Sequence, residues 1–408
     1  MNEIIERRDE FGFSHTNRPS AMKKLSIVFV IAALSAACAS SSKKADEKPA
    51  ELPDITPQLK VERVWSYGFG GDADHLRLAL RAAVVDGVAY AAGHKGEIAA
   101  LAADTGRKLW SVNTKLPLSA GPGIGRLSGA DDTQIVVFGA SDGTLLALDA
   151  KSGKERWRHR VSSEVLAAPV VAAGLVIVRT EDGRVSALSA DDAAQRWAFD
   201  QSVPRLSLRG TAKPVIAGNS VITAFDNGRV VSVELTTGDT QWDTAVGTPS
   251  GRSELDRMVD IDGPVSVVGD DVFVASFQSH IAMLARDSGQ IWWQRDFSSY
   301  RGLAVDATSL YATEADGAVV AMRRTDGSVS WEQKALHLRA LTAPVIDEQA
   351  LVVGDFDGYV HWLSAVDGSF LARAKTDGER ISNPPLVADG MVFVQTDGGK
   401  LIAFKTKG

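Results

Sequence analysis

Cysteine is nearly absent from this sequence: Cys38 is the single one among 408 residues. One cysteine forms no internal disulfide and supplies no multi-cysteine metal site. Positive charge is also in deficit, since 44 Lys and Arg face 51 Asp and Glu, for a formal net charge of −7. Because proteins that bind phosphate backbones usually carry the opposite balance, nucleic acid is excluded as an expected partner.

Common catalytic and nucleotide-binding patterns are missing as well. The sequence has no Gly-x-Ser-x-Gly elbow, no P-loop and no His-Glu-x-x-His pair, and its histidines are scattered. Few segments repeat apolar residues every 3.6 positions, so we expect almost no helix. These patterns therefore give no sign of an enzyme or of a metal or cofactor site.

The first 37 residues are organised like an export signal. Lys23 and Lys24 precede thirteen uncharged, mostly apolar residues at positions 25–37, a run too short to span a bilayer as a helix. Residues 1–21 are polar and charged and would bury such a signal. We therefore expect translation to start at Met22 and the signal region to end at residue 37.

The segment Leu34-Ser35-Ala36-Ala37-Cys38 resembles a bacterial lipobox, with Ser35 standing where that motif prefers leucine. The resemblance implies that Cys38 is lipidated. The lack of Asp after the cysteine implies sorting to the outer membrane, with the protein on its periplasmic side. Two or more acyl chains would hold it there stably. The alternative is an incidental cysteine in an ordinary cleaved signal.

Residues 38–59 have the composition of a linker. They lack aromatic side chains and are rich in Ser, Lys, Glu and Pro. Such a segment buries too little apolar surface to fold by itself. We expect a flexible tether here, joining the lipidated cysteine to a folded domain at residues 60–408.

The folded domain repeats itself. The segment ALDAKSGKERW at Ala147–Trp157 has counterparts along the chain, and Trp110 to Trp331 covers 221 residues in five intervals, about 44 per unit. This period is typical of a four-stranded propeller blade. A large indole at one place in each unit can pack one blade on the next, with its N–H bonded to a neighbouring carbonyl. Unit seven has Ala372 at that place, and we expect Trp362 to compensate.

The number of units comes from the hairpin turns, which mostly contain Asp-Gly or Asn-Gly. The eight turns lie near Gly96, Gly143, Gly183, Gly228, His280, Gly317, Gly358 and Gly398. The eighth unit stops at Gly408 before reaching a tryptophan, while an unmatched strand, Lys60–Tyr67, lies at the other end. We therefore expect an all-β, eight-bladed β-propeller of four-stranded antiparallel blades, closed by an N-terminal strand that completes the last blade.

The A-x-D-x-x-x-G-x-x-x-W pattern resembles the tryptophan-docking repeat of quinoprotein alcohol dehydrogenases. That resemblance raises an alternative function, a PQQ-dependent, dehydrogenase-like periplasmic propeller. Those enzymes need a calcium ion, a catalytic aspartate and commonly a disulfide between adjacent cysteines. This chain has its one cysteine in the signal region and lacks the long insertions that cap the cofactor. The shared repeat therefore indicates a shared fold rather than shared chemistry.

A lipobox-like signal, a short polar tether and a propeller of about 350 residues together resemble the BamB family, lipoproteins of the outer-membrane β-barrel assembly (BAM) machinery. Two segments carry the specific resemblance: VPRLSLRG at Val203–Gly210 and SELDRMVDIDG at Ser253–Gly263. In that family these segments form the surface that binds the POTRA region of BamA. The resemblance implies this role for Leu206, Leu208, Arg209, Asp260 and Asp262.

The same segments stand out on physical grounds. Successive interblade connections leave a propeller on one face, so residues 200–214 and 246–264 should be neighbours. The second is long, because 51 residues separate Trp242 from Trp293, and long ordered loops on rigid scaffolds often bind partners. Arg209 could instead pair with Asp260 or Asp262 inside the protein. The acids do not have the ligand spacing of a calcium loop.

The resemblance implies a non-enzymatic scaffold lipoprotein of the BAM complex. Such a protein binds BamA and assists the assembly and insertion of β-barrel proteins into the outer membrane. Unfolded outer-membrane proteins are a further expected partner. A generic periplasmic ligand-binding propeller is the remaining class of function.

Overall fold

The computed structural model describes residues 47–71, 76, 78–129 and 132–407. The expected signal region, the Met22 start and Cys38 lie outside these residues. The chain divides into two compact units, residues 1–48 and 49–408, and the β-sheets belong to the second unit. Among the described residues, no helix is long and apolar enough to cross a membrane.

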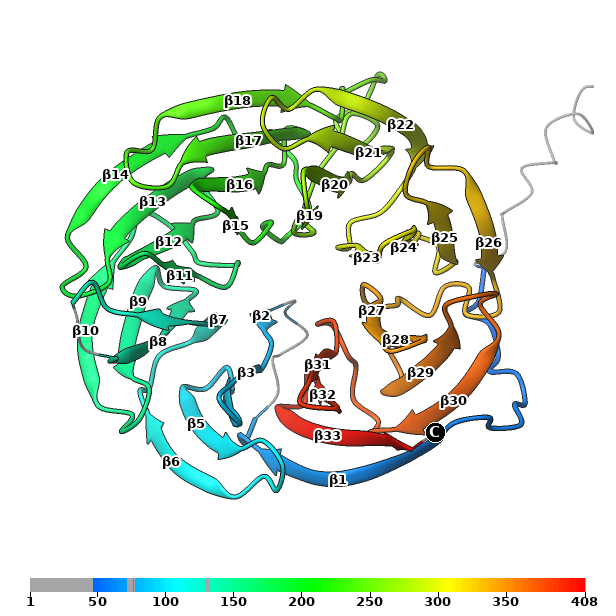
Figure 1. Ribbon diagram of the computed structural model, residues 1–408, viewed down its shortest axis with the longest axis horizontal. Helices are drawn as coiled ribbons and strands as arrows, with labels where there is room; N and C mark the ends of the chain where they lie inside the picture. The colour runs from blue at the N-terminus through cyan, green and yellow to red at the C-terminus, as the bar shows by residue number, and fades with distance from the viewer. Residues whose placement is uncertain (1–46, 72–75, 77, 130–131, 408) are drawn as a thin grey trace, which may run out of the picture. The chain divides into compact units, whose positions relative to one another are not determined.

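Eight β-sheets follow one another around a central axis, as Figure 1 shows. The described residues form strands and turns without an α-helix, as the missing helical period predicts. The strands of blades one to four are β3 (Ala83–Val85), β4 (Val88–Ala92), β5 (Glu97–Ala102) and β6 (Lys108–Asn113); β7 (Leu118–Arg126), β8 (Gln134–Ala140), β9 (Thr144–Asp149) and β10 (Glu155–Arg160); β11 (Val170–Ala172), β12 (Leu175–Arg179), β13 (Arg184–Ser189) and β14 (Gln195–Asp200); β15 (Val215–Ala217), β16 (Ser220–Ala224), β17 (Arg229–Glu234) and β18 (Thr240–Ala245).

The strands of blades five to eight are β19 (Ser266–Val268), β20 (Asp271–Ala275), β21 (Ser279–Ala285) and β22 (Ile291–Phe297); β23 (Ala304–Val305), β24 (Ser309–Thr313), β25 (Val319–Arg323) and β26 (Val329–Gln333); β27 (Val345–Asp347), β28 (Ala350–Gly354), β29 (Tyr359–Ser364) and β30 (Phe370–Lys375); β31 (Leu386–Ala388), β32 (Met391–Gln395), β33 (Lys400–Lys407) and β1 (Lys60–Gly68). The short strand β2 (Ala79–Leu80) pairs parallel to β7 and extends blade two.

Burial along the strands explains the two sequence patterns. The second strands are buried throughout, as in β12, or at every residue after the first, as in β16, because neighbouring blades cover both of their faces. The outer strands alternate instead: in β18 only Trp242 is buried, between exposed or half-exposed neighbours. A continuous run of apolar residues is therefore typical of an inner strand of a blade, and an alternation of apolar and polar residues is typical of an outer strand.

The ring closes as the sequence predicts. Strand β1 pairs antiparallel with β33, from Lys60 opposite Lys407 to Gly68 opposite Lys400, in the order β1-β33-β32-β31. The N-terminal strand thus becomes the outer strand of blade eight (Figure 1). Pairing β1 with β33 covers an edge that would otherwise be open.

The recurring tryptophans join neighbouring blades, as predicted. Each indole N–H donates a hydrogen bond of 2.8–3.0 Å to a backbone carbonyl of the next blade. The donor and acceptor pairs are Trp65–Ala103, Trp110–Ala150, Trp157–Ala190, Trp197–Leu235, Trp242–Arg286, Trp293–Arg324 and Trp331–Ala365. The repeated glycine has its reason here, because a Cβ on Gly153 would lie 2.6 Å from the Trp110 ring. In blade seven, Trp362 is fully buried and packs against Phe404, with ring centroids 6.0 Å apart.

The hairpin turns lie where the sequence predicts them, with one shift of a residue. Gly143, with φ +81°, adopts the left-handed conformation that glycine allows. In the last turn the residue with positive φ is Gly399, not Gly398. In blade five, where the sequence offers no glycine near His280, Gln278 takes that conformation with φ +53°.

Residues 49–59 differ from the expected flexible tether. The N–H of Ala50 donates to the His337 carbonyl at 2.9 Å, and the N–H of Gln58 donates to the Leu371 carbonyl at 2.8 Å. The Arg373 guanidinium also donates to the Pro53 carbonyl at 3.1 Å. The tether prediction is wrong for these residues, because their backbone carbonyls and amides find partners on the propeller that their polar composition does not reveal.

Candidate functional site

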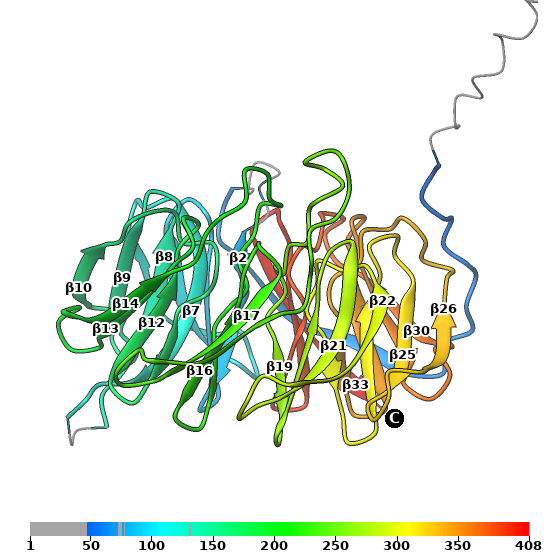
Figure 2. The same ribbon diagram turned by 90° about the horizontal axis from the view of Figure 1, so that it is seen from above.

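The two segments singled out in the sequence lie together. Residues 201–214 connect β14 to β15, and residues 246–265 connect β18 to β19. Figure 2 shows both connections projecting from the same face of the ring. They are tied to each other because the backbone N–H of Leu208 donates a hydrogen bond to the Asp260 carboxylate. We call these two connections the docking loops.

Arg209 is half exposed and extends from the first docking loop toward a third connection. Its Nη2 lies 3.0 Å from Oε2 of Glu164, between blades two and three, and the two side chains are 40% and 37% exposed. The alternative that Arg209 pairs with Asp260 or Asp262 is therefore wrong. A pair this exposed stabilises the fold by only about 0–1 kcal/mol.

Apolar side chains on the docking loops face solvent. Leu206 is 42% exposed, while Leu208 is half buried. Sequence reasoning missed Val203 and Leu255, which are 40% and 60% exposed. Their apolar character in long polar connections was the signal that could have found them, since large apolar side chains left in water on ordered loops are typical of interaction surfaces.

The two acids of the second loop face inward. Asp260 is fully buried, and burial raises its pKa to about 6, although the N–H of Leu208 acts in the opposite direction. Burial, followed by the nearby charges of Asp226 and Asp260, raises the pKa of Asp262 to about 8. These carboxyls support the loops from beneath, whereas the sequence suggested that they belong to the contact surface itself.

A buried charge cluster lies under the docking loops and was not foreseen. Arg179, at the end of β12, is fully buried, with its Nη2 2.7 Å from Oδ1 of Asp226. Its guanidinium lies 4.7 Å from the centre of the Phe225 ring. Burial also raises the pKa of neighbouring Glu181 to about 7. These residues come from separate blades, so no local spacing in the sequence brings them together.

The described residues contain no group of three or more His, Cys, Asp or Glu side chains that could hold a metal ion. Asp226 pairs with Arg179, and Asp260 accepts a hydrogen bond from the backbone. The geometry of the site thus fits recognition of a protein surface, through exposed leucines and an arginine on a rigid frame.

Comparisons with known proteins give one consistent family. The family model described as outer membrane protein assembly factor BamB matches residues 94–333 and 334–408. The BamB of Pseudomonas aeruginosa is 38% identical over 367 residues, which cover 90% of this chain and 94% of that protein. The BamB of Xanthomonas campestris is 35% identical over 375 residues, 90% of each chain.

Solved structures agree with these relatives. The crystal structure of BamB from Moraxella catarrhalis has a TM-score of 0.76 at 29% identity and covers 85% of this chain and 100% of that one. The quinohemoprotein alcohol dehydrogenase of Comamonas testosteroni has a TM-score of 0.66 at 14% identity, over 84% of this chain and 76% of that one. The second likeness shows the propeller fold alone.

Proposed function

Because the chain belongs to the BamB family of outer membrane protein assembly factors, we propose that it works as a scaffold whose docking loops bind BamA. The family is one of assembly factors, in keeping with the non-enzymatic function expected from the sequence. The quinone-dependent alternative loses its support, since the dehydrogenases share only the fold with this chain. The observation that carries the BamA contact is the exposure of Leu206 and Arg209 on the first docking loop, which the buried carboxylate of Asp260 ties to the second.

The five residues have different roles in the proposed contact. Leu206 and Arg209 are exposed and touch the partner. Leu208 is half buried and contributes through its backbone N–H, which Asp260 holds in place. Asp260 and Asp262 act as positioning residues, since the first is fully buried and the second is largely enclosed.

Co-purification with BamA from solubilised outer membranes tests this contact. We expect Leu206→Ala to lose most of the co-purifying BamA while its melting temperature stays close to that of the wild type. Leu109→Ala is the matched control, because Leu109 is 43% exposed on the outer strand of blade one. Retention of BamA by the Leu206 variant, or equal loss in the control, would show that the docking loops are not the contact surface.

We also propose that the protein is held at the outer membrane by a lipid on Cys38, on the periplasmic side. The support is the lipobox-like segment that ends at this residue. Cys38→Ser should move the protein from the membrane fraction into the soluble periplasmic fraction. Metabolic palmitate labelling checks the chemistry, and labelling that persists in the variant would contradict the assignment.

A further inference from the structure

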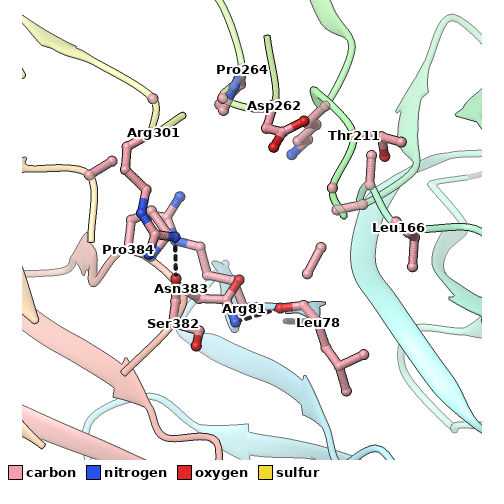
Figure 3. A pocket seen from close by; sticks show the side chains of 18 of the residues that line it. Leu78, Arg81, Leu166, Thr211, Asp262, Pro264, Arg301, Ser382, Asn383 and Pro384 are labelled. Atoms are coloured by element: carbon pink, nitrogen blue, oxygen red, sulfur yellow. Dashed lines mark hydrogen bonds between the residues drawn. The ribbon is translucent and has the colours of Figure 1, made fainter. Parts of the chain in front are cut away.

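The central channel opens beside the docking loops into a cavity of about 360 Å³. Seven of the eight connections between successive blades contribute to its walls, together with Pro122 of β7, and Figure 3 shows it between Arg301, Asp262, Leu166 and Arg81. The walls are mostly apolar and include side chains such as Leu78 and Pro264. A pocket of this size and character fits a small organic ligand.

Cationic side chains gather in this apolar cavity. The cationic lining residues are Arg81, Arg209, Lys213 and Arg301, of which Arg209 pairs with Glu164. The Nη2 of Arg81 donates to the Pro385 carbonyl at 2.6 Å, while its buried Nε has no hydrogen-bond partner in the described part of the chain. Arg301 donates to the Ser382 carbonyl at 3.3 Å (Figure 3). The Pro385 carbonyl holds the Arg81 guanidinium in position and brings no formal negative charge.

The positive charge of Arg81 acts on Lys213. Burial lowers the pKa of Lys213, and the charge of Arg81 lowers it further. Burial lowers the pKa of Arg81 to about 10, so this side chain is still protonated at pH 7. The fold therefore places two basic groups on the wall of one mostly apolar cavity, with Arg81 half-buried and the Lys213 side chain at the cavity opening, where it still reaches solvent.

Acidic side chains balance these two groups poorly. Asp262 is the acid among the lining residues of this cavity, and its pKa of about 8 keeps it mostly protonated at pH 7. Glu164 is engaged with Arg209. Asp397 interacts electrostatically with Arg301. Asp397 belongs to blade eight, whereas Lys213 lies between blades three and four. An anion that entered the cavity beside Arg81 would thus find favourable charge together with apolar walls.

We propose that the channel mouth binds a carboxylate carried on an apolar body. Arginine and lysine donate charge-assisted hydrogen bonds to a carboxylate, which are the stronger kind of hydrogen bond. The apolar walls cover the rest of the ligand. A phosphate dianion fits less well, because bringing two charges into an apolar cavity costs more than bringing one. This site borders the proposed BamA contact, because Arg209 and Asp262 of the docking loops also line the cavity, but it depends on Arg81 and Lys213, which that contact does not use.

Calorimetric titration of the purified full-length protein with two matched probes tests the proposal. One probe is 4-phenylbutyrate, and the other is its uncharged amide, 4-phenylbutanamide. We expect the acid to bind at least about tenfold more tightly than the amide, as charge-assisted hydrogen bonds require. We expect Lys213→Gln to remove most of this difference and Lys405→Gln, an exposed lysine on β33, to leave it unchanged.

Three results would overturn the proposal: no binding of the acid, equal binding of acid and amide, or an affinity unaffected by Lys213→Gln in a protein that still melts like the wild type. Arg81→Gln provides a second variant with the same expectation. Inorganic phosphate should bind more weakly than 4-phenylbutyrate. Tighter binding of phosphate would contradict the proposal that the ligand has an apolar body.

The source of the carboxylate is distinguished by a further pair of probes, the tripeptide Leu-Ala-Phe with a free and with an amidated C-terminus. Tighter binding of the free tripeptide than of 4-phenylbutyrate would identify the end of a polypeptide as the ligand, and the opposite order a free organic acid. BamA co-purification is measured separately on Lys213→Gln. The co-purification tests the BamA contact, and the titrations test the carboxylate site. A negative result in one experiment therefore does not decide the other.

Discussion

Arg179 shows how much of the site depends on contacts between blades. Its buried guanidinium lies beside Asp226, while Asp260, Asp262 and Glu181 contribute further acids nearby. The sequence identified Asp260 and Asp262 through a family pattern but suggested a place at the surface for them. Their inward position could not be predicted, because it results from how loops from blades three to five pack after the ring has formed.

Asp262 makes this cluster testable through pH. Its pKa is about 8 in the folded protein, against an ordinary value of 3.8. The stability associated with its proton is therefore complete below about pH 4 and is lost as the pH rises toward 8. We expect Asp262→Asn, which cannot ionise, to gain in melting temperature over the wild type as the pH increases from about 5 to about 9.

Thermal denaturation across that pH range measures the effect. The control is Asp287→Asn, the same substitution at an exposed position of blade five away from the buried cluster. A melting-temperature difference for Asp262→Asn that stays constant across the whole range would contradict a buried, protonated Asp262.

At the scale of elements, the sequence predicted what repeats and missed what occurs once. The strand at Lys60–Tyr67 was recognisable because the last unit lacked one, and it is found as β1 from Lys60 to Gly68. Residues 49–59 offered no such signal, since their contacts with Leu371 and Arg373 run mainly through the backbone. Strand β2, which pairs parallel to β7, has no counterpart in other units and was also missed.

Ring closure by β1 leads to a deletion experiment. Removal of residues 61–67 takes the outer strand from blade eight and exposes β33, so we expect aggregation or loss of soluble, folded protein. It also removes the hydrogen bond from Trp65 to Ala103, which joins blade eight to blade one. Removal of residues 40–48, which lie outside the unit that contains the β-sheets, should leave the melting temperature nearly unchanged. Equal melting of the two deletion proteins would argue against closure by β1.

At the scale of the whole molecule, the closed ring brings the connections between blades together on one face. The repeat predicted eight blades, and the long interval before Trp293 indicated where a loop would project. The cavity beside the docking loops could not be predicted, because Arg81 and Lys213 are far apart in the sequence and meet only at the channel mouth. The propeller thus forms a frame that positions both the docking loops and the cavity, on which the two proposed binding sites lie.

The sharpest test of BamA docking compares the affinity for BamA with thermal stability in the Arg209→Ala variant. A desolvated interface arginine commonly contributes about 2 kcal/mol or more to binding, roughly thirtyfold in affinity. Its exposed pair with Glu164 contributes only about 0–1 kcal/mol to folding. Arg158→Ala is the matched control, because Arg158 pairs with Glu155 at the same 3.0 Å and with similar exposure. We predict a loss of affinity of roughly thirtyfold or more for Arg209→Ala with an almost unchanged melting temperature; a variant that melts much earlier yet binds BamA normally when folded would contradict docking through this loop.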